Sequence, residues 1–162
     1  MDANTDNHML IIENQIKKCW EKAGRIIEEF DIYGGGTESD EEDACYELEI
    51  MIKLLEENEV PWIVRKEILD QMLDFIASDN SGFTDYLMDI ALIMCKSKQE
   101  NIYLADFLSK NANFYYKRLA AKIYLENGEE QKFLENKREN LEYGSDYLEL
   151  ASYYKKIMRR QL

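Results

Sequence analysis

Apolar residues recur three and four positions apart along almost the whole chain, which is the spacing of an amphipathic α-helix. Between 7 and 30 they fall near one helical face: Leu10, Ile12, Ile16, Cys19, Ala23, Ile26, Ile27 and Phe30. Short polar or glycine-containing stretches divide the pattern into about eight helices. One proline and seven glycines among 162 residues leave the intervening stretches unbroken. The sequence therefore predicts an all-α fold.

Residues that favour helix starts precede several of these helices. Ser39 with Glu42, and Ser97 with Glu100, have the spacing of a capping box, in which each side chain bonds the other residue's backbone N–H. Pro61 suits the first turn of a third helix because its φ angle is fixed near the helical value. These signals predict that the second, third and fifth helices begin at these three places.

Glycine and asparagine mark the ends of other helices. No helix continues easily through Gly34-Gly35-Gly36, since each glycine costs about 1 kcal/mol relative to alanine. Together with the acidic residues that follow, this triplet predicts a flexible loop over 34–43. Further along, either Asn111 or Asn113 can cap a sixth helix, and Gly128 can close it as the residue after the C-cap.

The predicted helices form a single domain over 1–162, with an N-terminal helix over 1–33, the loop over 34–43 and a helical-repeat body over 44–162. A seventh helix, over 129–143, is mostly polar and is expected to be exposed. Because the connections contain few residues, consecutive helices must fold back antiparallel. Tyr-Leu pairs recur at intervals about as long as one helix plus the turn that follows it, which favours stacked hairpins in a short α-solenoid. These pairs are Tyr86-Leu87, Tyr103-Leu104, Tyr124-Leu125 and Tyr147-Leu148.

The C-terminal part of the chain carries residues at the positions of a known helical repeat. They are Leu119-Ala120, Ile123-Tyr124, Gly128 and Phe133-Leu134, and a second Leu-Ala start, Leu150-Ala151, follows 31 residues after the first. This segment resembles a tetratricopeptide-type repeat, although the family's first-helix tryptophan and turn-closing proline are missing. The resemblance implies antiparallel hairpins stacked in a right-handed superhelix that presents a concave binding face.

A wider stretch, roughly 60–160, contains the strings GFTDYLMDIAL, YYKRLAAKIYLENGEE and ENLEYGSDYLELASYY. These strings resemble the helical-repeat region of bacterial proteins that elsewhere carry SWIM-type zinc fingers. The finger itself requires CxC followed by CxH, which the sequence lacks, and His8 is the only histidine. The resemblance therefore implies a helical-repeat fold, and neither a zinc site nor another cofactor is expected.

Negative charge is concentrated near the start of the chain: residues 1–60 hold 17 acidic and 5 basic residues, against 16 and 15 in 61–162. Such a charge repels nucleic acid and anionic membranes and attracts a basic partner; the alternative is a solvated surface that only keeps the protein soluble. The longest apolar stretch, around Ile90–Cys95, is too short to span a bilayer. No signal peptide is recognisable, and three scattered cysteines form no CxxC pair, so a cytoplasmic location is expected: Cys19, Cys45 and Cys95.

Paired carboxylates are the strongest candidate for catalytic chemistry. Glu67 and Asp70 have the ExxD spacing of MazG-like nucleotide pyrophosphohydrolases, in which helical carboxylates hold Mg²⁺, and Glu42 lies upstream. The other half of that motif, EExxE, fails because Cys45 stands at its last position. A metal-dependent hydrolase using these three carboxylates is therefore an alternative, and the main expectation is a protein that is not an enzyme.

Exposed tyrosines and the acidic segment are the candidate interface. Phe114, Tyr115 and Tyr116 are consecutive, so one helical face cannot bury all three, and Tyr153 next to Tyr154 poses the same question. We expect a non-enzymatic protein–protein interaction module with two tyrosines as anchors and four acidic residues steering a basic partner: Tyr115, Tyr153, Asp40, Glu41, Glu42 and Asp43. An immunity or antitoxin protein that neutralises a basic toxin is the alternative among binding proteins.

Overall fold

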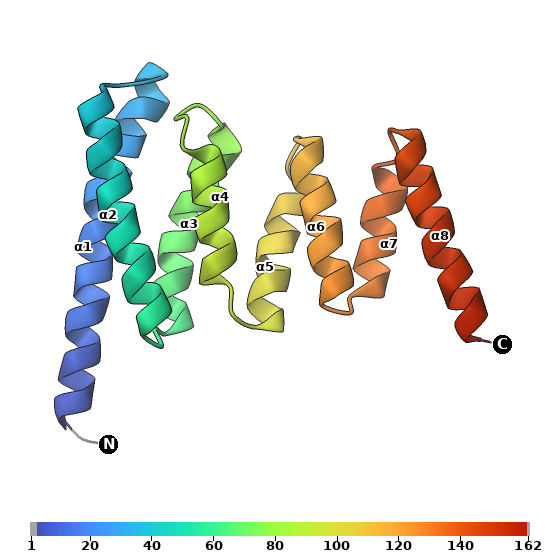
Figure 1. Ribbon diagram of the computed structural model, residues 1–162, viewed down its shortest axis with the longest axis horizontal. Coiled ribbons are helices and arrows are strands. Elements are labelled where there is room, and N and C mark those ends of the chain that lie inside the picture. The colour runs from blue at the N-terminus through green and yellow to red at the C-terminus, as the bar shows by residue number, and fades with distance from the viewer. Residues whose placement is uncertain (1–2, 162) are drawn as a thin grey trace. The chain divides into compact units, whose positions relative to one another are not determined.

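The structure, a computed structural model, describes residues 3–161, and in that range it contains eight α-helices and no strand (Figure 1). The helices are α1 (Ala3–Tyr33), α2 (Glu38–Glu57), α3 (Trp62–Ser78), α4 (Thr84–Met94), α5 (Lys98–Ser109), α6 (Phe114–Glu126), α7 (Glu130–Glu139) and α8 (Gly144–Arg160). The predicted all-α fold is confirmed, and so is the expected number of helices.

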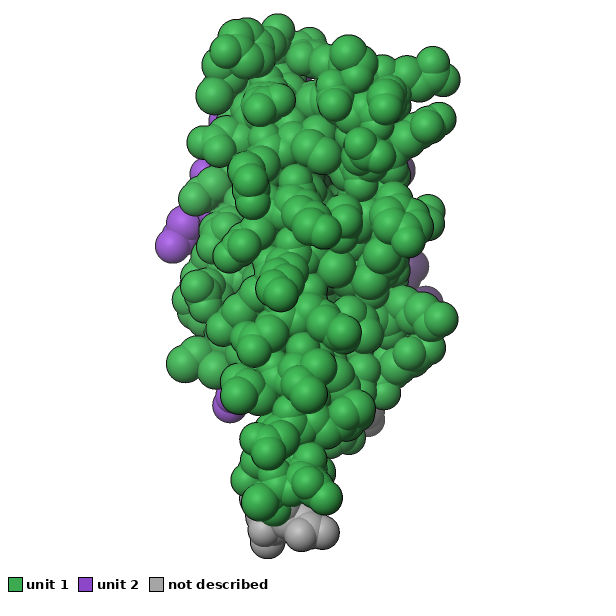
Figure 2. All heavy atoms as spheres, turned by 90° about the vertical axis from the view of Figure 1, so that its left-hand side faces the viewer, with its two compact units in different colours: residues 1–94 green, residues 95–162 purple. Residues whose placement is uncertain are grey.

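The chain divides into two compact units, residues 1–94 (unit 1) and residues 95–162 (unit 2), which Figure 2 colours separately. Unit 1 contains α1 to α4, and unit 2 contains α5 to α8. The sequence of unit 1 holds 23 acidic and 7 basic residues, a net charge of −16, whereas unit 2 holds 10 acidic and 13 basic residues, a net charge of +3. The entire acidic excess of the protein therefore belongs to unit 1.

Unit 1 is built from two antiparallel hairpins, α1–α2 and α3–α4 (Figure 1). Helix α1 contacts both α2 and α3, and α4 contacts both α3 and α2, so the four helices share one core. Burial of each large aliphatic side chain there contributes about 1.5–3 kcal/mol to the stability of the unit. The fully buried large side chains of this core include Ile16, Ile27, Leu48, Met51, Leu55, Leu69, Met72, Leu73, Ile76, Leu87 and Ile90.

Helix α1 is longer than the predicted span of 7–30, and one residue predicted on its buried face, Leu10, is exposed. The cause is a difference in length: α1 has 31 residues and α2 has 20, so the first turns of α1 extend past the end of α2 (Figure 1). The remaining residues of the predicted face are buried, apart from Ile26, which is half-buried.

The connection between α1 and α2 is shorter than the predicted loop over 34–43, because α2 already begins at Glu38. The predicted N-cap, Ser39, is also wrong. The N-cap is Thr37, whose hydroxyl oxygen accepts a hydrogen bond from the backbone N–H of Asp40 at 3.2 Å. Acidic side chains in the first turn favour this helix start because they lie at the positive end of the helix dipole. The segment we expected to be flexible is therefore largely helical.

The glycine triplet is held against the end of α1. A side chain at Gly36 would meet the ring of Phe30, since a Cβ atom there would lie 2.3 Å from that ring. The Phe30 ring in turn packs edge-on against Phe83, with ring centroids 5.2 Å apart. The backbone N–H of Gly35 donates to the carbonyl of Phe30 at 3.0 Å. The close approach of the chain to Phe30 thus explains why glycine stands at position 36.

In unit 2 the predicted capping signals are confirmed. Ser97 and Glu100 form both hydrogen bonds of a capping box at the start of α5. Of the two asparagines proposed for α6, Asn113 is the N-cap and accepts from the backbone N–H of Tyr115 at 2.9 Å. Gly128 follows the C-cap of α6 with φ +75°, a left-handed conformation that favours glycine.

Helix α7 ends at Glu139, with Asn140 as its C-cap, and so is shorter than the predicted span to 143; Tyr143 is the N-cap of α8. The expectation that this helix is exposed was wrong in part. Helix α7 contacts both α6 and α8, and it buries Phe133, Asn136 and Lys137. Lys137 is buried because its ammonium group forms an ion pair with Glu149 of α8 at 2.6 Å.

Candidate functional site

Helix α8 leaves most of its apolar surface uncovered. Among residues 144–160, Asp146 is the one buried residue. Tyr147, Leu148 and Met158 are 57%, 71% and 67% exposed. With Ala151 and Lys155 they recur three or four positions apart, so they lie along one side of the helix. We call these five residues the outer face of α8: Tyr147, Leu148, Ala151, Lys155 and Met158.

The opposite side of α8 is attached to α7. The ring of Tyr153 packs on Phe133 with centroids 4.9 Å apart. Its hydroxyl oxygen is enclosed without a hydrogen bond of normal geometry among the described residues. Burial, followed by the nearby carboxylate of Glu130, raises the pKa of Tyr153. Tyr153 is therefore a packing residue of this unit, with its ring turned to α7.

The start of α8 is fixed by the carboxylate of Asp146. Its two oxygens accept from Nη2 of Arg118 at 2.9 Å, from the backbone N–H of Tyr143 at 2.9 Å and from that of Glu142 at 3.3 Å. The Tyr143 N–H and the Arg118 guanidinium hold the pKa of Asp146 below its usual value. The Arg118 guanidinium also lies over the ring of Phe114, 4.8 Å from its centre. These contacts tie the first turn of α8 to α6.

Positive charge accompanies the apolar residues toward the end of α8. Four exposed basic residues lie in its last two turns: Lys155, Lys156, Arg159 and Arg160. Arg159 and Arg160 stand in the final turn, where cations complement the negative end of the helix dipole. The outer face of α8 is therefore apolar in its first half and mixed apolar and basic in its second half.

The residues predicted for the interface belong to different units. Tyr115, on α6 of unit 2, is 64% exposed, with its ring edge against Tyr116. Asp40 is half-buried and Glu41, Glu42 and Asp43 are exposed, all four in the first two turns of α2 in unit 1. Sequence reasoning missed Leu148 and Met158 as a pair, although their helical spacing was the available signal.

The carboxylates of the alternative hydrolase do not gather into a metal site. Residues 3–161 hold no group of three or more His, Cys, Asp or Glu side chains that could bind a metal ion. Glu42 lies on α2, whereas Glu67 and Asp70 lie on α3, and the Asp70 carboxylate is paired with Lys66 at 2.6 Å. The hydrolase alternative therefore has no metal-binding cluster within the described part of the chain.

A polar network in unit 2 joins α5, α6 and α7. The hydroxyl of Tyr124 donates to Oδ1 of Asp106 at 2.6 Å, and the Lys132 ammonium donates to the same oxygen at 2.9 Å. Burial, together with the hydrogen bond to Asp106, raises the pKa of Tyr124 above its usual value. The Tyr124 hydroxyl donates within this network, which fixes three helices together.

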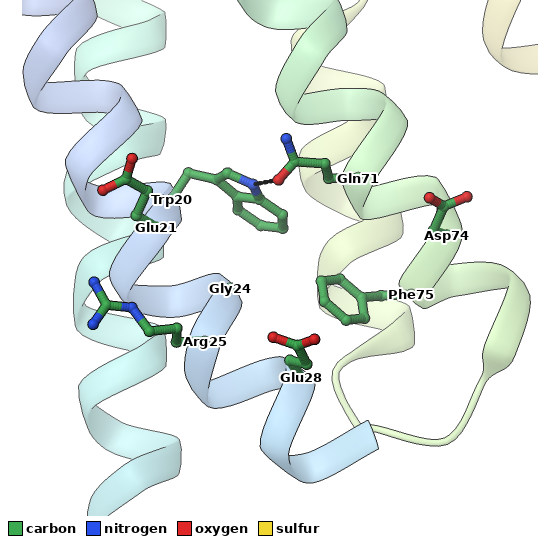
Figure 3. A pocket seen from close by; sticks show the side chains of 8 residues that line it. All are labelled: Trp20, Glu21, Gly24, Arg25, Glu28, Gln71, Asp74 and Phe75. Atoms are coloured by element: carbon green, nitrogen blue, oxygen red, sulfur yellow. Dashed lines mark hydrogen bonds between the residues drawn. The ribbon is translucent and has the colours of Figure 1, made fainter. Parts of the chain in front are cut away.

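A recess lies between α1 and α3 in unit 1 (Figure 3). Its volume is about 500 Å³, and eight residues line it: Trp20, Glu21, Gly24, Arg25, Glu28, Gln71, Asp74 and Phe75. The indole N–H of Trp20 donates to Oε1 of Gln71 at 2.7 Å, so the two helices are joined across the recess. Sequence reasoning did not single out any of these residues, because α1 and α3 are far apart in the sequence.

Comparison with protein-family models, curated proteins and solved structures finds no match to this chain. The resemblance to tetratricopeptide-type repeats and to SWIM-associated helical regions therefore stays a prediction. Within residues 3–161, no helix combines the length and the apolar character needed to cross a membrane.

Proposed function

We propose that this protein is a non-enzymatic protein–protein interaction module whose partner packs on the outer face of α8. The exposure of Tyr147, Leu148 and Met158 along one side of a single helix carries this proposal. Burial of one such side chain in an interface contributes about 1.5–3 kcal/mol. An apolar helical side with this spacing is suited to contact another helix or a groove.

Long-range attraction of a basic partner is the second part of the proposal. Unit 1 carries a net charge of −16, and the exposed carboxylates of Glu41, Glu42 and Asp43 stand at the start of α2. Such a field raises the association rate of a positively charged protein at low ionic strength and is screened by salt. The apolar contact on α8 would thus supply affinity for the partner, and the negative charge of unit 1 would increase the rate at which the partner binds.

An immunity or antitoxin protein that neutralises a basic toxin is a second candidate, favoured by the same charge of unit 1. It differs from a general adaptor in having one dedicated partner. A gene for a basic nuclease-like protein beside the gene for this chain, together with inhibition of that nuclease by this protein, would support it. A neighbouring product that is unaffected by this protein would exclude that partner.

Capture of the partner from cells that make the protein tests the proposal. Leu148→Glu places a charge in the apolar first half of the outer face, and Leu125→Glu is a matched control because Leu125 is also exposed but lies on α6. A partner should be retained by the wild-type protein and by the control and be lost with Leu148→Glu, while all three keep the same helical circular dichroism. Equal retention by Leu148→Glu would place the binding surface elsewhere.

A further inference from the structure

The α1–α2 hairpin of unit 1 has one side that the unit leaves uncovered. Helices α3 and α4 pack on the hairpin through the α1–α3 and α2–α4 contacts. Figure 1 places α1 and α2 at the edge of unit 1, and Figure 2 looks onto the side that faces away from α3 and α4. A groove runs between α1 and α2 on this side. It consists of two recesses of about 410 and 510 Å³, which share Lys22, Tyr46 and Glu47.

The middle of the groove is apolar. Tyr46 is 63% exposed at its rim, and half-buried aliphatic side chains of both helices lie beside it. These side chains are Ile26, Ile50 and Leu54. Because Tyr46, Ile50 and Leu54 are four positions apart, they form one row along α2. An apolar row of this kind is suited to contact another helix.

The two rims of the groove carry opposite charge. Four of the seven basic residues of unit 1 lie on α1 within 17–25, whereas α2 holds nine acidic residues and one basic residue. Lys22 and Glu47 pair across the groove at 3.4 Å. Arg25 and Asp43 are exposed and line the same recess, and neither forms an ion pair within residues 3–161. Both are therefore available to a partner.

A second copy of this chain matches this charge pattern. If two hairpins face each other about a two-fold axis parallel to their helices, α1 of each copy lies on α2 of the other, and the basic rim meets the acidic rim. An axis across the helices would instead place α1 on α1, so that Lys18, Lys22 and Arg25 meet the same residues of the other copy. Charge therefore selects the first arrangement. The net charge of −13 on each chain opposes association, but exposed charges more than about 8 Å apart are largely screened at physiological ionic strength.

The hairpin is also large enough for a stable dimer. Helix α2 has 20 residues and is therefore about 30 Å long. Two helices, each about 10 Å wide, present roughly 600 Å² in projection. A stable interface buries about 800 Å² on each partner, and the accessible area of protruding side chains exceeds their projection.

We propose that the protein forms a symmetric dimer through this side of the α1–α2 hairpin. Tyr46 of each copy contacts Ile26 of the other. At the same level along the helices, Arg25 of one copy pairs with Asp43 of the other. All four residues line one recess, so the two-fold axis brings them together. The contact does not involve the outer face of α8, which stays available to the partner of the proposed function.

Sedimentation equilibrium of the full chain tests the dimer. The average mass should rise with concentration in the micromolar range, from 19.2 kDa toward twice that value. Tyr46→Glu should weaken the dimer at least about tenfold, because it places a charge in the apolar middle of the interface. Tyr33→Glu is the matched control, since Tyr33 is 80% exposed and lines neither recess, and it should leave the dimer unchanged. Both variants should keep the helical circular dichroism of the wild type.

Two charge reversals test which rims meet. Arg25→Glu brings a carboxylate against Asp43 of the other copy, and Asp43→Arg brings a guanidinium against Arg25. Each variant alone should dimerise about three- to tenfold more weakly than the wild type. In a mixture, a dimer with one chain of each kind has both opposite-charge contacts again, so its affinity should return to near the wild-type value. Arg25→Glu changes the net charge from −13 to −15 and Asp43→Arg changes it to −11, so net repulsion alone would give the mixture an intermediate affinity.

The expected result is a mixture that dimerises more tightly than either charge variant alone. A chain that stays at 19.2 kDa at every concentration would overturn the inference and leave the groove to a helix of another protein. Equal losses with Tyr46→Glu and Tyr33→Glu, or a mixture of intermediate affinity, would also overturn it. A dimer that is lost with Leu148→Glu but kept with Tyr46→Glu would move the contact to α8 and refute this interface.

Discussion

Gly36→Ala is expected to destabilise unit 1, although it adds only one methyl group. The added Cβ atom would lie 2.3 Å from Cε2 and 2.6 Å from Cζ of Phe30, far inside van der Waals contact. Phe30 cannot turn aside easily, since it is buried and packs against Phe83. Overpacking of this kind costs about 1–3 kcal/mol. The φ angle of Gly36 is not in the left-handed region, so the effect isolates the steric contact.

Urea unfolding followed by tryptophan fluorescence measures this loss. Both tryptophans, Trp20 and Trp62, lie in unit 1, so the signal reports unit 1 alone. With a urea dependence of about 1.5 kcal/mol per molar, the midpoint should fall by about 0.7–2 M. Gly34→Ala provides a comparison, because it places alanine at φ +70° with open space around it. It should lower the free energy of unfolding by about 1 kcal/mol through backbone strain alone.

Gly144→Ala is the control, because a Cβ atom there meets nothing within 4 Å and the residue is helical. It should leave the fluorescence midpoint unchanged, as it lies in unit 2. An unchanged midpoint for Gly36→Ala would mean that residues 34–36 move freely relative to Phe30, as the sequence alone had suggested. The packing described for this connection would then be refuted.

Three further outcomes follow from other parts of the structure. Because the pKa of Asp146 is lowered in the folded protein, the unfolded chain binds the proton first as pH falls. The stabilisation that the Asp146 carboxylate provides is therefore fully present above about pH 4 and is lost as pH falls through the pKa of the folded protein. Asp146→Asn should therefore lower the melting temperature at neutral pH, and its difference from wild type should shrink in acid; a constant difference would contradict the assignment. Burial raises the pKa of the Cys19 thiol to about 11, so iodoacetamide at pH 8 should label Cys19 in the folded protein about a hundredfold more slowly than in urea, as measured by peptide mass spectrometry. Addition of Mg²⁺ or Mn²⁺ should leave the melting temperature unchanged, since the described residues offer no metal-binding cluster, and a saturable increase would revive the hydrolase alternative.

Local signals in the sequence predicted much of the helix arrangement. The capping box of Ser97 and Glu100 involves residues three positions apart, so its geometry depends on nothing distant. The same reasoning misplaced the start of α2, because Ser39 with Glu42 and Thr37 with Asp40 both satisfy a capping pattern within one acidic segment. The backbone conformation of residues 34–38 determines which of the two residues caps the helix, and the capping pattern in the sequence does not predict that conformation.

Features that depend on contacts between distant residues were not predictable in this way. The helix that contains Lys137 was expected to be exposed. Lys137 is buried because it pairs with Glu149, and the sequence of α7 alone does not reveal this contact because Glu149 belongs to the next helix. The spacing of the apolar residues in α8 was available from the sequence, but periodicity alone cannot show which of them lack a partner. The recess beside Trp20 requires residues of α1 and α3 together, such as Gln71, 51 positions further along the chain.

The sparse attachment of α8 also has a consequence for its motion. Helix α8 has 17 residues, and Asp146 is the one that is buried, so little apolar burial opposes local opening of the helix. Its backbone amides should therefore exchange with solvent sooner than those of α3. A partner that covers the outer face would suppress this opening, and part of the interaction energy would be spent on ordering the helix. The affinity of such a contact would then be lower than the area that it buries suggests.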